Sequence, residues 1–170
     1  MTAVTLRPLE AGDVDVAASW LSLEENYKWL DFGGGQQSLS AASLAFMRLR
    51  DLHELLVFTV GEGPEPCGIV ALSNVARPFG TASLWYVLGK KEHAGHGCTT
   101  RAVGQLLEMA FGALGLQAVN AWAVDGNVPS LRVLERNGFR LVGRQRRCHR
   151  VEGRLRDRLL FDLLAEERPG

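Results

Sequence analysis

The stretch from Gly95 to Thr100 has the residue types of an anion-binding loop. Gly95-His96-Gly97 follows a β-rich segment and precedes a long amphipathic one, with Thr99 and Thr100 in its first turn. Glycines let backbone amides approach a ligand closely. The first amides of a helix lack a partner inside the helix and carry partial positive charge. The pattern therefore favours a phosphate or pyrophosphate as ligand, although a Gly-x-Gly turn also serves tight strand–helix packing.

Two better-known phosphate motifs do not fit this stretch. A dinucleotide fingerprint needs a third glycine, but the two threonines are followed by Arg101. A P-loop needs Gly-Lys-Ser or Gly-Lys-Thr, which the sequence does not contain. The ligand of this loop is therefore expected to differ from a Rossmann-bound dinucleotide or a P-loop nucleotide.

A second informative stretch lies about thirty residues further on, from Asn127 to Phe139. Pro129 suits the first turn of a helix, and Gly138 suits the left-handed position that ends one. Asn127 is placed to cap this helix, and Ser130 brings a hydroxyl into its first turn. A purely structural interpretation therefore explains most of the stretch.

Composition bounds the remaining possibilities. The 170 residues carry 19 basic and 19 acidic side chains and are 46% apolar, as in a globular domain. The zero net charge and the lack of a long apolar run argue against nucleic-acid and membrane partners. Eight arginines nevertheless gather at positions 140–158 with two acids, a local charge of +6. Three cysteines without metal or redox spacing predict reduced thiols, no metal site and a cytoplasmic location.

Hydrophobic periodicity gives the elements that must position these residues. Strands are predicted at 4–7, 54–60, 68–75, 81–88, 116–124, 139–147 and 154–164. Helices are predicted at 13–21, 40–51, 97–114 and 129–137, and an aromatic, Gly-rich loop at 24–37. A β-meander followed by strand–helix–strand–helix–strand–strand predicts an α/β fold, with residues 1–170 forming a single domain.

Taken together, the two stretches resemble the GNAT superfamily of acyl-CoA-dependent N-acyltransferases. Its Q/R-x-x-G-x-G/A motif is matched by residues 92–97. The pattern N-x-x-S-x-x-x-L-E-x-x-G-F, typical of the branch that acetylates ribosomal-protein alanines, is matched by Asn127, Ser130, Leu134, Glu135, Gly138 and Phe139. The opening at 6–9 and the ending at 155–164 also resemble that branch. The resemblance therefore covers essentially the whole chain.

The resemblance implies a mixed, mostly antiparallel sheet of about seven strands with about four helices. Its fourth and fifth strands would be splayed to admit the pantetheine arm of acetyl-CoA. It also implies direct transfer of an acetyl group to a primary amine in a ternary complex. The backbone amide of Leu88 would polarise the thioester carbonyl, Ser130 would protonate the CoA thiolate, and Asn127 would contact the cofactor arm. Cofactor binding is then expected at Val87, Leu88, Ala94, Gly95, His96, Gly97, Cys98, Thr99, Thr100 and Asn127.

The chain departs from the family pattern in ways that leave the base open. Glu92 and His96 put less positive charge near the phosphates than is usual in the family. Leu134 stands where many relatives carry a tyrosine that acts as the general acid. The strand at 81–88 has no carboxylate to act as base. An amine nucleophile must lose a proton before attack. The candidates for that role are His53, Asp31, Glu25 and His93, with Tyr86 as a relay.

Partners and donor also stay open. The acceptor is expected to be an amine, either a protein N-terminus or a small molecule, and the enzyme a monomer or homodimer. One alternative takes the acyl group from the phosphopantetheine arm of an acidic carrier protein, or uses a donor other than acetyl, with the carrier bound at Arg144, Arg146, Arg147 and Arg150. A second alternative is a non-catalytic module that binds acyl-CoA.

Overall fold

A computed structural model describes residues 2–168 of the chain and contains one seven-stranded sheet of order β1-β2-β3-β4-β5-β7-β6. The strands are β1 (Val4–Pro8), β2 (Glu54–Val60), β3 (Gly68–Ala76), β4 (Thr81–Leu88), β5 (Ala118–Val124), β6 (Arg140–Val151) and β7 (Arg154–Leu164). The helices are α1 (Val14–Leu21), α2 (Glu24–Tyr27), α3 (Ala41–Arg48), α4 (Cys98–Phe111) and α5 (Val128–Arg136).

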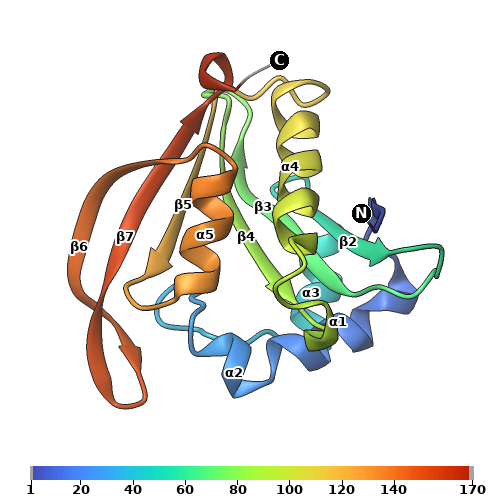
Figure 1. Cartoon of the computed structure of the whole chain (residues 1–170), viewed down its shortest axis with the longest axis horizontal. Helices are drawn as coiled ribbons and strands as arrows, with labels where there is room; N and C mark the ends of the chain where they lie inside the picture. The colour runs from blue at the N-terminus through green and yellow to red at the C-terminus, as the bar shows by residue number, and fades with distance from the viewer. Residues whose placement is uncertain (1, 169–170) are drawn as a thin grey trace.

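The sheet is mixed and mostly antiparallel, as predicted. Strands β1 to β4 form an antiparallel meander, and β5, β7 and β6 pair antiparallel on the other side. The β4–β5 pair is parallel and is joined through α4, because parallel neighbours need a crossover connection. Helices α4 and α5 lie together on one face of the sheet (Figure 1).

The parallel pair separates after three residues. Thr81, Ala82 and Ser83 face Ala118, Val119 and Asn120. At the last of these positions, the Ser83 hydroxyl donates to Asn120 Oδ1 over 2.8 Å. No pairing joins the rest of β4 to β5 within residues 2–168, and the two strands diverge in Figure 1. This is the splayed sheet that the motif resemblance predicted.

The sheet carries a hydrophobic core on each face. On one face, β4 contributes Leu84 to a buried cluster with Leu106 of α4 and Leu134 of α5. On the opposite face, Val87 of the same strand packs in a cluster with residues of α1 and α3. Successive side chains of a strand point to opposite faces, so β4 serves both clusters. Its side chains therefore reach both sides of the opening.

Several predicted segments differ from the structure. The helices predicted at 40–51 and 97–114 span Ala41–Arg48 and Cys98–Phe111, and the strand predicted at 116–124 begins at Ala118. The segment 24–37 contains the short helix α2, whose first turn holds two glutamates that favour a helix N-terminus. Strand β6 runs to Val151 rather than to residue 147, because its pairing with β7 resumes after a β-bulge between Gln145 and His149. There Arg147 adopts a positive φ of 51°, and its amide donates to Asp157 Oδ1 over 2.8 Å. Among residues 2–168, no helix is both long and apolar enough to cross a bilayer.

Candidate active site

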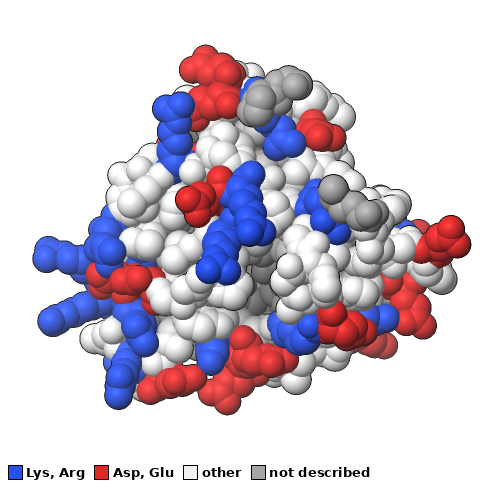
Figure 2. Space-filling model, in the orientation of Figure 1, with Lys and Arg blue, Asp and Glu red and all other residues white. Residues whose placement is uncertain are grey.

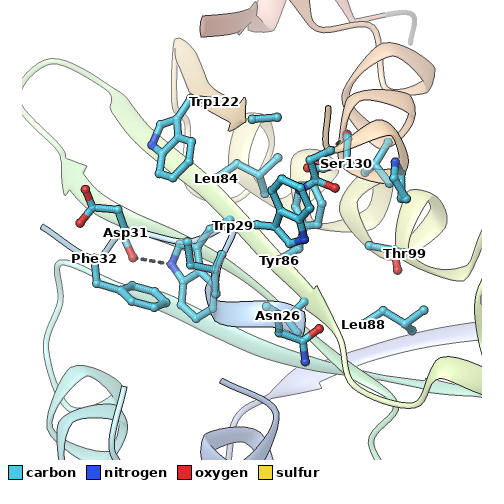
Figure 3. A pocket seen from close by; sticks show the side chains of 18 of the residues that line it. Asn26, Trp29, Asp31, Phe32, Leu84, Tyr86, Leu88, Thr99, Trp122 and Ser130 are labelled. Atoms are coloured by element: carbon cyan, nitrogen blue, oxygen red, sulfur yellow. Dashed lines mark hydrogen bonds between the residues drawn. The ribbon is translucent and has the colours of Figure 1, made fainter. Parts of the chain in front are cut away.

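A cavity of about 1080 Å³ lies at the opening between β4 and β5. Figure 3 shows Trp29, Tyr86 and Ser130 in the middle of this pocket, with Leu88 and Thr99 toward one side and Asp31 and Trp122 toward the other. Residues from both faces of the sheet contribute to its wall. We call the part formed by Leu88, Ala94–Thr100, Asn127 and Ser130 the donor end, and the part formed by Trp29, Asp31, Phe32, His53, Trp85, Trp122 and Arg158 the acceptor end.

The free edge of β4 supplies backbone groups to the donor end. Gly89 donates its amide to Cys67 O over 2.9 Å, and bonded and open pairs alternate along an antiparallel ladder. Val87 is therefore bonded to β3, while the amides of Tyr86 and Leu88 point toward the opening. The carbonyl of Leu88 already accepts a hydrogen bond of 2.7 Å from Lys91 Nζ. The structure thus presents the predicted Leu88 amide to the cavity and commits the Val87 main chain to the sheet.

The start of α4 supplies further amides. Gly97 is the N-cap with a φ of 73°, and no side chain caps the helix. Gly95 also has a positive φ, 79°, and a Cβ there would find nothing within 4 Å. These residues, with Ala94, Thr99 and Thr100, line the cavity. The predicted anion-binding loop therefore opens into the cavity.

Two other predicted cofactor residues of this loop are placed differently. Cys98 is 2% exposed, and its sulfur accepts from Arg101 Nη2 over 3.5 Å, so its side chain packs in the core. Its backbone still belongs to the open first turn of α4. The His96 side chain is exposed and lies outside the cavity wall. The loop therefore offers backbone donors rather than a positive side chain at position 96.

Ser130 sits in the first turn of α5, where its hydroxyl meets Tyr86. The two hydroxyl oxygens are 2.8 Å apart, and the Tyr86 oxygen is also 3.0 Å from Ser130 O, so its single hydrogen is donated either to Ser130 Oγ or to Ser130 O. Burial raises the pKa of Tyr86, outweighing the hydrogen bond to Ser130, so the phenol stays protonated at neutral pH. When the phenol hydrogen points to Ser130 Oγ, the serine hydrogen is free to be given away.

The rest of α5 fixes this serine in place. Asn127 occupies the predicted N-cap position, but its side chain makes no capping bond and lines the cavity instead. Asn137 donates to Thr100 O over 3.2 Å and so ties α5 to α4. Leu134 is completely buried. Leu134, at the position that the resemblance assigns to a general-acid tyrosine in many relatives, is therefore part of the core in this chain.

Asp31, one of the candidates for the base, already accepts three hydrogen bonds from the protein. Its carboxylate accepts from Arg158 Nη2 over 2.8 Å and from the amides of Gly33 and Gly35 over 2.8 and 3.0 Å. Burial by itself would raise the pKa of Asp31, but these hydrogen bonds together lower it. A carboxylate held in its ionised form by three donors is a poor proton acceptor. Glu25 lies exposed at the rim of the same cavity.

His53 is placed better for proton transfer. Its Nδ1 lies 3.0 Å from Ser73 Oγ, which also accepts from Trp85 Nε1 over 2.8 Å. Burial, together with the nearby Arg50 cation, lowers the pKa of His53, so its ring is neutral at pH 7. If Nδ1 carries the hydrogen toward Ser73, then Nε2 keeps a free lone pair. His93, the other histidine candidate, also lines the cavity.

Several contributors to the cavity carry no signal in the sequence. Lys91 joins Asn26 Oδ1 and Leu88 O over 2.6 and 2.7 Å, which links α2 to the end of β4. Burial lowers the pKa of Lys91, and the Glu25 carboxylate partly opposes that shift. Arg158 lies 4.0 Å from the centre of the Trp122 ring. The Lys91–Asn26 and Arg158–Trp122 contacts join elements that are distant in sequence, so periodicity does not reveal them.

The arginine-rich strands form a hairpin at the edge of the sheet. In Figure 2, basic side chains gather at the left of the molecule, where β6 and β7 lie in Figure 1. Arg144 pairs with Asp125 and Asp157 over 3.0 and 2.8 Å. Among residues 2–168, no carboxylate comes within pairing distance of the side chains of Arg146, Arg147, Arg150, Arg154 and Arg156. Much of the local positive charge is therefore free of intramolecular acids.

Sequence comparison places the chain among acetyltransferases. The profile of the Acetyltransferase (GNAT) domain matches residues 3–140, a range that includes the loop before α4 and all of α5. The uncharacterised N-acetyltransferase p20 of Bacillus licheniformis is 28% identical over 172 residues, covering 98% of this chain and 96% of that protein. The resemblance indicated by the two motifs is thereby confirmed.

Solved structures share the same fold. RimJ of Mycobacterium smegmatis, in complex with CoA-disulfide, superposes with a TM-score of 0.81 at 26% identity, covering 98% of this chain and 84% of that chain. The spermidine N-acetyltransferase of Vibrio cholerae, in complex with CoA and spermine, gives a TM-score of 0.84 at 18% identity, covering 96% of each chain. At that lower identity the likeness shows the fold alone.

Proposed function

The chain belongs to the GNAT family and is an acyltransferase, and we propose that it transfers an acetyl group from acetyl-CoA to a primary amine. The observation that carries this proposal is the free edge of β4, which faces the cavity together with the uncapped start of α4. An extended pantetheine arm can pair with the open Tyr86 and Leu88 amides. A pyrophosphate fits the amides of residues 94–100. CoA bound to RimJ supports the same ligand here.

The proposed reaction is a direct transfer between two bound substrates. Acetyl-CoA supplies an activated thioester. His53 Nε2 accepts a proton from the amine, whose nitrogen then forms a bond to the thioester carbonyl carbon. The Leu88 amide stabilises the negative charge that develops on the carbonyl oxygen. As the carbon–sulfur bond breaks, Ser130 gives its proton to the sulfur. The proton that His53 accepted from the amine passes to solvent water, and water returns one to Ser130, so both side chains regain their starting state.

Two measurements test this function. Calorimetry should detect acetyl-CoA binding to the full chain, and an assay of free thiol should detect CoA release when a suitable amine is added. Binding without thiol release for any amine would instead favour a non-catalytic acyl-CoA module. Failure to bind acetyl-CoA would contradict both functions.

The unpaired arginines of the β6–β7 hairpin favour a second candidate donor, an acyl group on an acidic carrier protein. Replacing Arg146, Arg147 and Arg150 by glutamine should then weaken turnover with the acylated carrier while sparing turnover with acetyl-CoA. An equal loss of turnover with both donors would count against the carrier as a donor.

A further inference from the structure

The acceptor end of the cavity is walled by aromatic rings. Trp29, Phe32, Trp85 and Trp122 are all half-buried and all line the cavity. Phe32 and Trp85 pack edge to face with their ring centres 5.0 Å apart, so their orientations are fixed. Flat, rigid walls of this kind bind planar or apolar bodies through stacking and burial.

The acceptor end offers little to a polycation. Its buried carboxylate, Asp31, already accepts three hydrogen bonds, one of them from Arg158. Among the described wall residues, the other carboxylate is Glu25, which is exposed at the rim. A polyamine needs several unengaged acids to replace its water. The charge pattern therefore disfavours such an acceptor.

Arg158 instead leaves one donor group available. Its Nη2 bonds to Asp31, and its Nε donates to His149 Nδ1 over 3.2 Å. Its Nη1 makes no hydrogen bond to any residue from 2 to 168, although the side chain keeps 13% of its surface exposed and lines the cavity. Asp31 and His149 thus hold the guanidinium through Nη2 and Nε, with Nη2 also 2.9 Å from His149 Nδ1, and the remaining Nη1 is suited to a carboxylate or carbonyl oxygen.

The proposed base, His53, also limits which amines can react, through the pKa of the amine. A neutral histidine removes a proton more readily from an α-amino group beside an amide carbonyl, as in a peptide, whose pKa is about 7.7–8.0, than from an alkylamine near 10.4. An α-amino group is also the amine that lies beside a carboxylate or carbonyl carbon. The aromatic wall, the open Arg158 Nη1 and His53 thus point to one kind of molecule.

We propose that the acceptor is an α-amino acid, or its amide, with a planar aromatic side chain. Its ring would lie against Trp29, Trp85 and Trp122, its carboxylate or carbonyl oxygen would accept from Arg158, and its amine would face His53. This inference rests on the proposed acetyl transfer and adds the class of acceptor. Recognition of the oxygen by Arg158 is the step that sets the selectivity.

The test is a thiol-release assay over a small panel of amines. Phenylalanine, tryptophan and their primary amides should be acetylated with kcat/KM about 10- to 100-fold above phenethylamine, which lacks the oxygen. They should also exceed alanine, which lacks the ring, and spermidine, which lacks both. The free acids and the amides distinguish a carboxylate from a carbonyl as the oxygen recognised.

Variants at the ion pair sharpen the test. Arg158→Met removes the open donor and leaves Asp31 without its cation. The preference for phenylalanine over spermidine should therefore fall by about 10- to 100-fold, with part of the change arising from better use of spermidine. The double variant Arg158→Met, Asp31→Asn removes the free carboxylate and should lose that gain. Unchanged acetyl-CoA binding in calorimetry would show that both variants are folded.

The outcomes separate the two levels of the proposal. Spermidine or phenethylamine as the best acceptor, or an equal loss for all acceptors in Arg158→Met, would overturn the acceptor class and leave acetyl transfer standing. No thiol release with any amine would overturn acetyl transfer itself, and the acceptor class with it.

Discussion

The donor end of the cavity is formed mainly by backbone groups, whereas the acceptor end is formed by side chains. The donor end uses backbone amides at the free edge of β4 and at the start of α4, supported by Ser130 and Asn127. The acceptor end uses side chains from β4, β5, β7, the residue before β2 and the segment that follows α2. A backbone site depends on local geometry that a short motif encodes. A side-chain site depends on which distant residues meet, and it can change while the fold stays the same.

This difference separates chemistry shared by a family from selectivity. The thioester is the same for every acceptor, so the donor end can bind it with backbone groups, which do not depend on the identity of the side chains. The acceptor differs from enzyme to enzyme, and here its half consists of aromatic rings and one engaged ion pair. We therefore expect changes at the donor end to affect all acceptors equally and changes at the acceptor end to affect selectivity.

The largest effect is expected at Ser130. Loss of a general acid costs about 10²- to 10⁴-fold in rate, so Ser130→Ala should lower kcat by that order for every acceptor while acetyl-CoA affinity stays unchanged. The control is Ser40→Ala, which removes a hydroxyl that caps α3 by accepting from the Ser43 amide over 3.1 Å. That variant should cost about 1 kcal/mol of stability and no activity. Steady-state kinetics and thermal unfolding measure the two effects.

Tyr86 tests whether the serine acts alone. Tyr86→Phe removes the hydroxyl 2.8 Å from Ser130 Oγ and should lower kcat by up to about tenfold. In a Ser130→Ala background the same change should have no effect, because the phenol acts through the serine. Equal losses in both backgrounds would mean that Tyr86 contributes independently.

An effect larger than that of Tyr86→Phe, but no larger than that of Ser130→Ala, is expected at the base. His53→Gln should lower kcat/KM by about 10²-fold at pH 7. The loss should shrink as the pH rises and the acceptor amine loses its proton unaided. His93→Gln is the matched control, since His93 lines the same cavity and is the rival histidine. A pH profile that loses its acidic limb only in His93→Gln would reverse the assignment.

Gly95 should show a still smaller effect, confined to the donor end. Gly95 and Gly115 both have positive φ, 79° and 63°, and a Cβ added at either would have no neighbouring atom within 4 Å. Gly95→Ala and Gly115→Ala should therefore each cost about 1 kcal/mol of stability. Only Gly95→Ala should weaken acetyl-CoA binding, by about tenfold, because its methyl group projects where amides approach the phosphates. Calorimetry and thermal unfolding compare the pair.

The sequence signals for the donor end are local. Gly95, Gly97, Asn127 and Ser130 each lie in a stretch whose spacing gives both an element boundary and a role, and all four line the cavity. The order of strands and helices along the chain after the meander also followed from periodicity. The exception is His96, whose side chain points away from the cavity, because the side-chain direction within a left-handed glycine turn is not a matter of spacing.

The acceptor end could be predicted only as a set of candidates. Asp31 and Arg158 are 127 positions apart, and nothing in either neighbourhood indicates their pairing. His53 and Asp31 looked equivalent as bases in the sequence. Their difference comes from partners that only tertiary structure supplies, namely three donors on Asp31 and one serine on His53.

The smallest effect expected is on stability, at the far side of the acceptor end. His149 is 4% exposed, and its Nδ1 accepts from Arg158 Nε, which leaves Nε2 to donate to Lys28 O over 2.8 Å. Burial, together with the Arg158 cation, lowers the pKa of His149 below its ordinary 6.5, although Lys28 O and Asp31 oppose this. Below that pH the unfolded chain binds a proton that the folded chain refuses, so stability falls as the pH falls.

Thermal unfolding at pH 7.5 and pH 5.5 (about one unit either side of the ordinary histidine pKa) measures this loss. Tm should be lower at the acidic pH, and His149→Gln, which keeps one donor and one acceptor but no titrating ring, should reduce the difference. His53 shifts in the same direction and accounts for a remainder, whereas Asp31, with its lowered pKa, titrates only below 3.8. If the contacts of His149 with Arg158 and Lys28 close the acceptor end, a fall in pH should also impair turnover before it impairs acetyl-CoA binding. An equal pH dependence in His149→Gln would mean that this histidine does not couple the hairpin to the cavity.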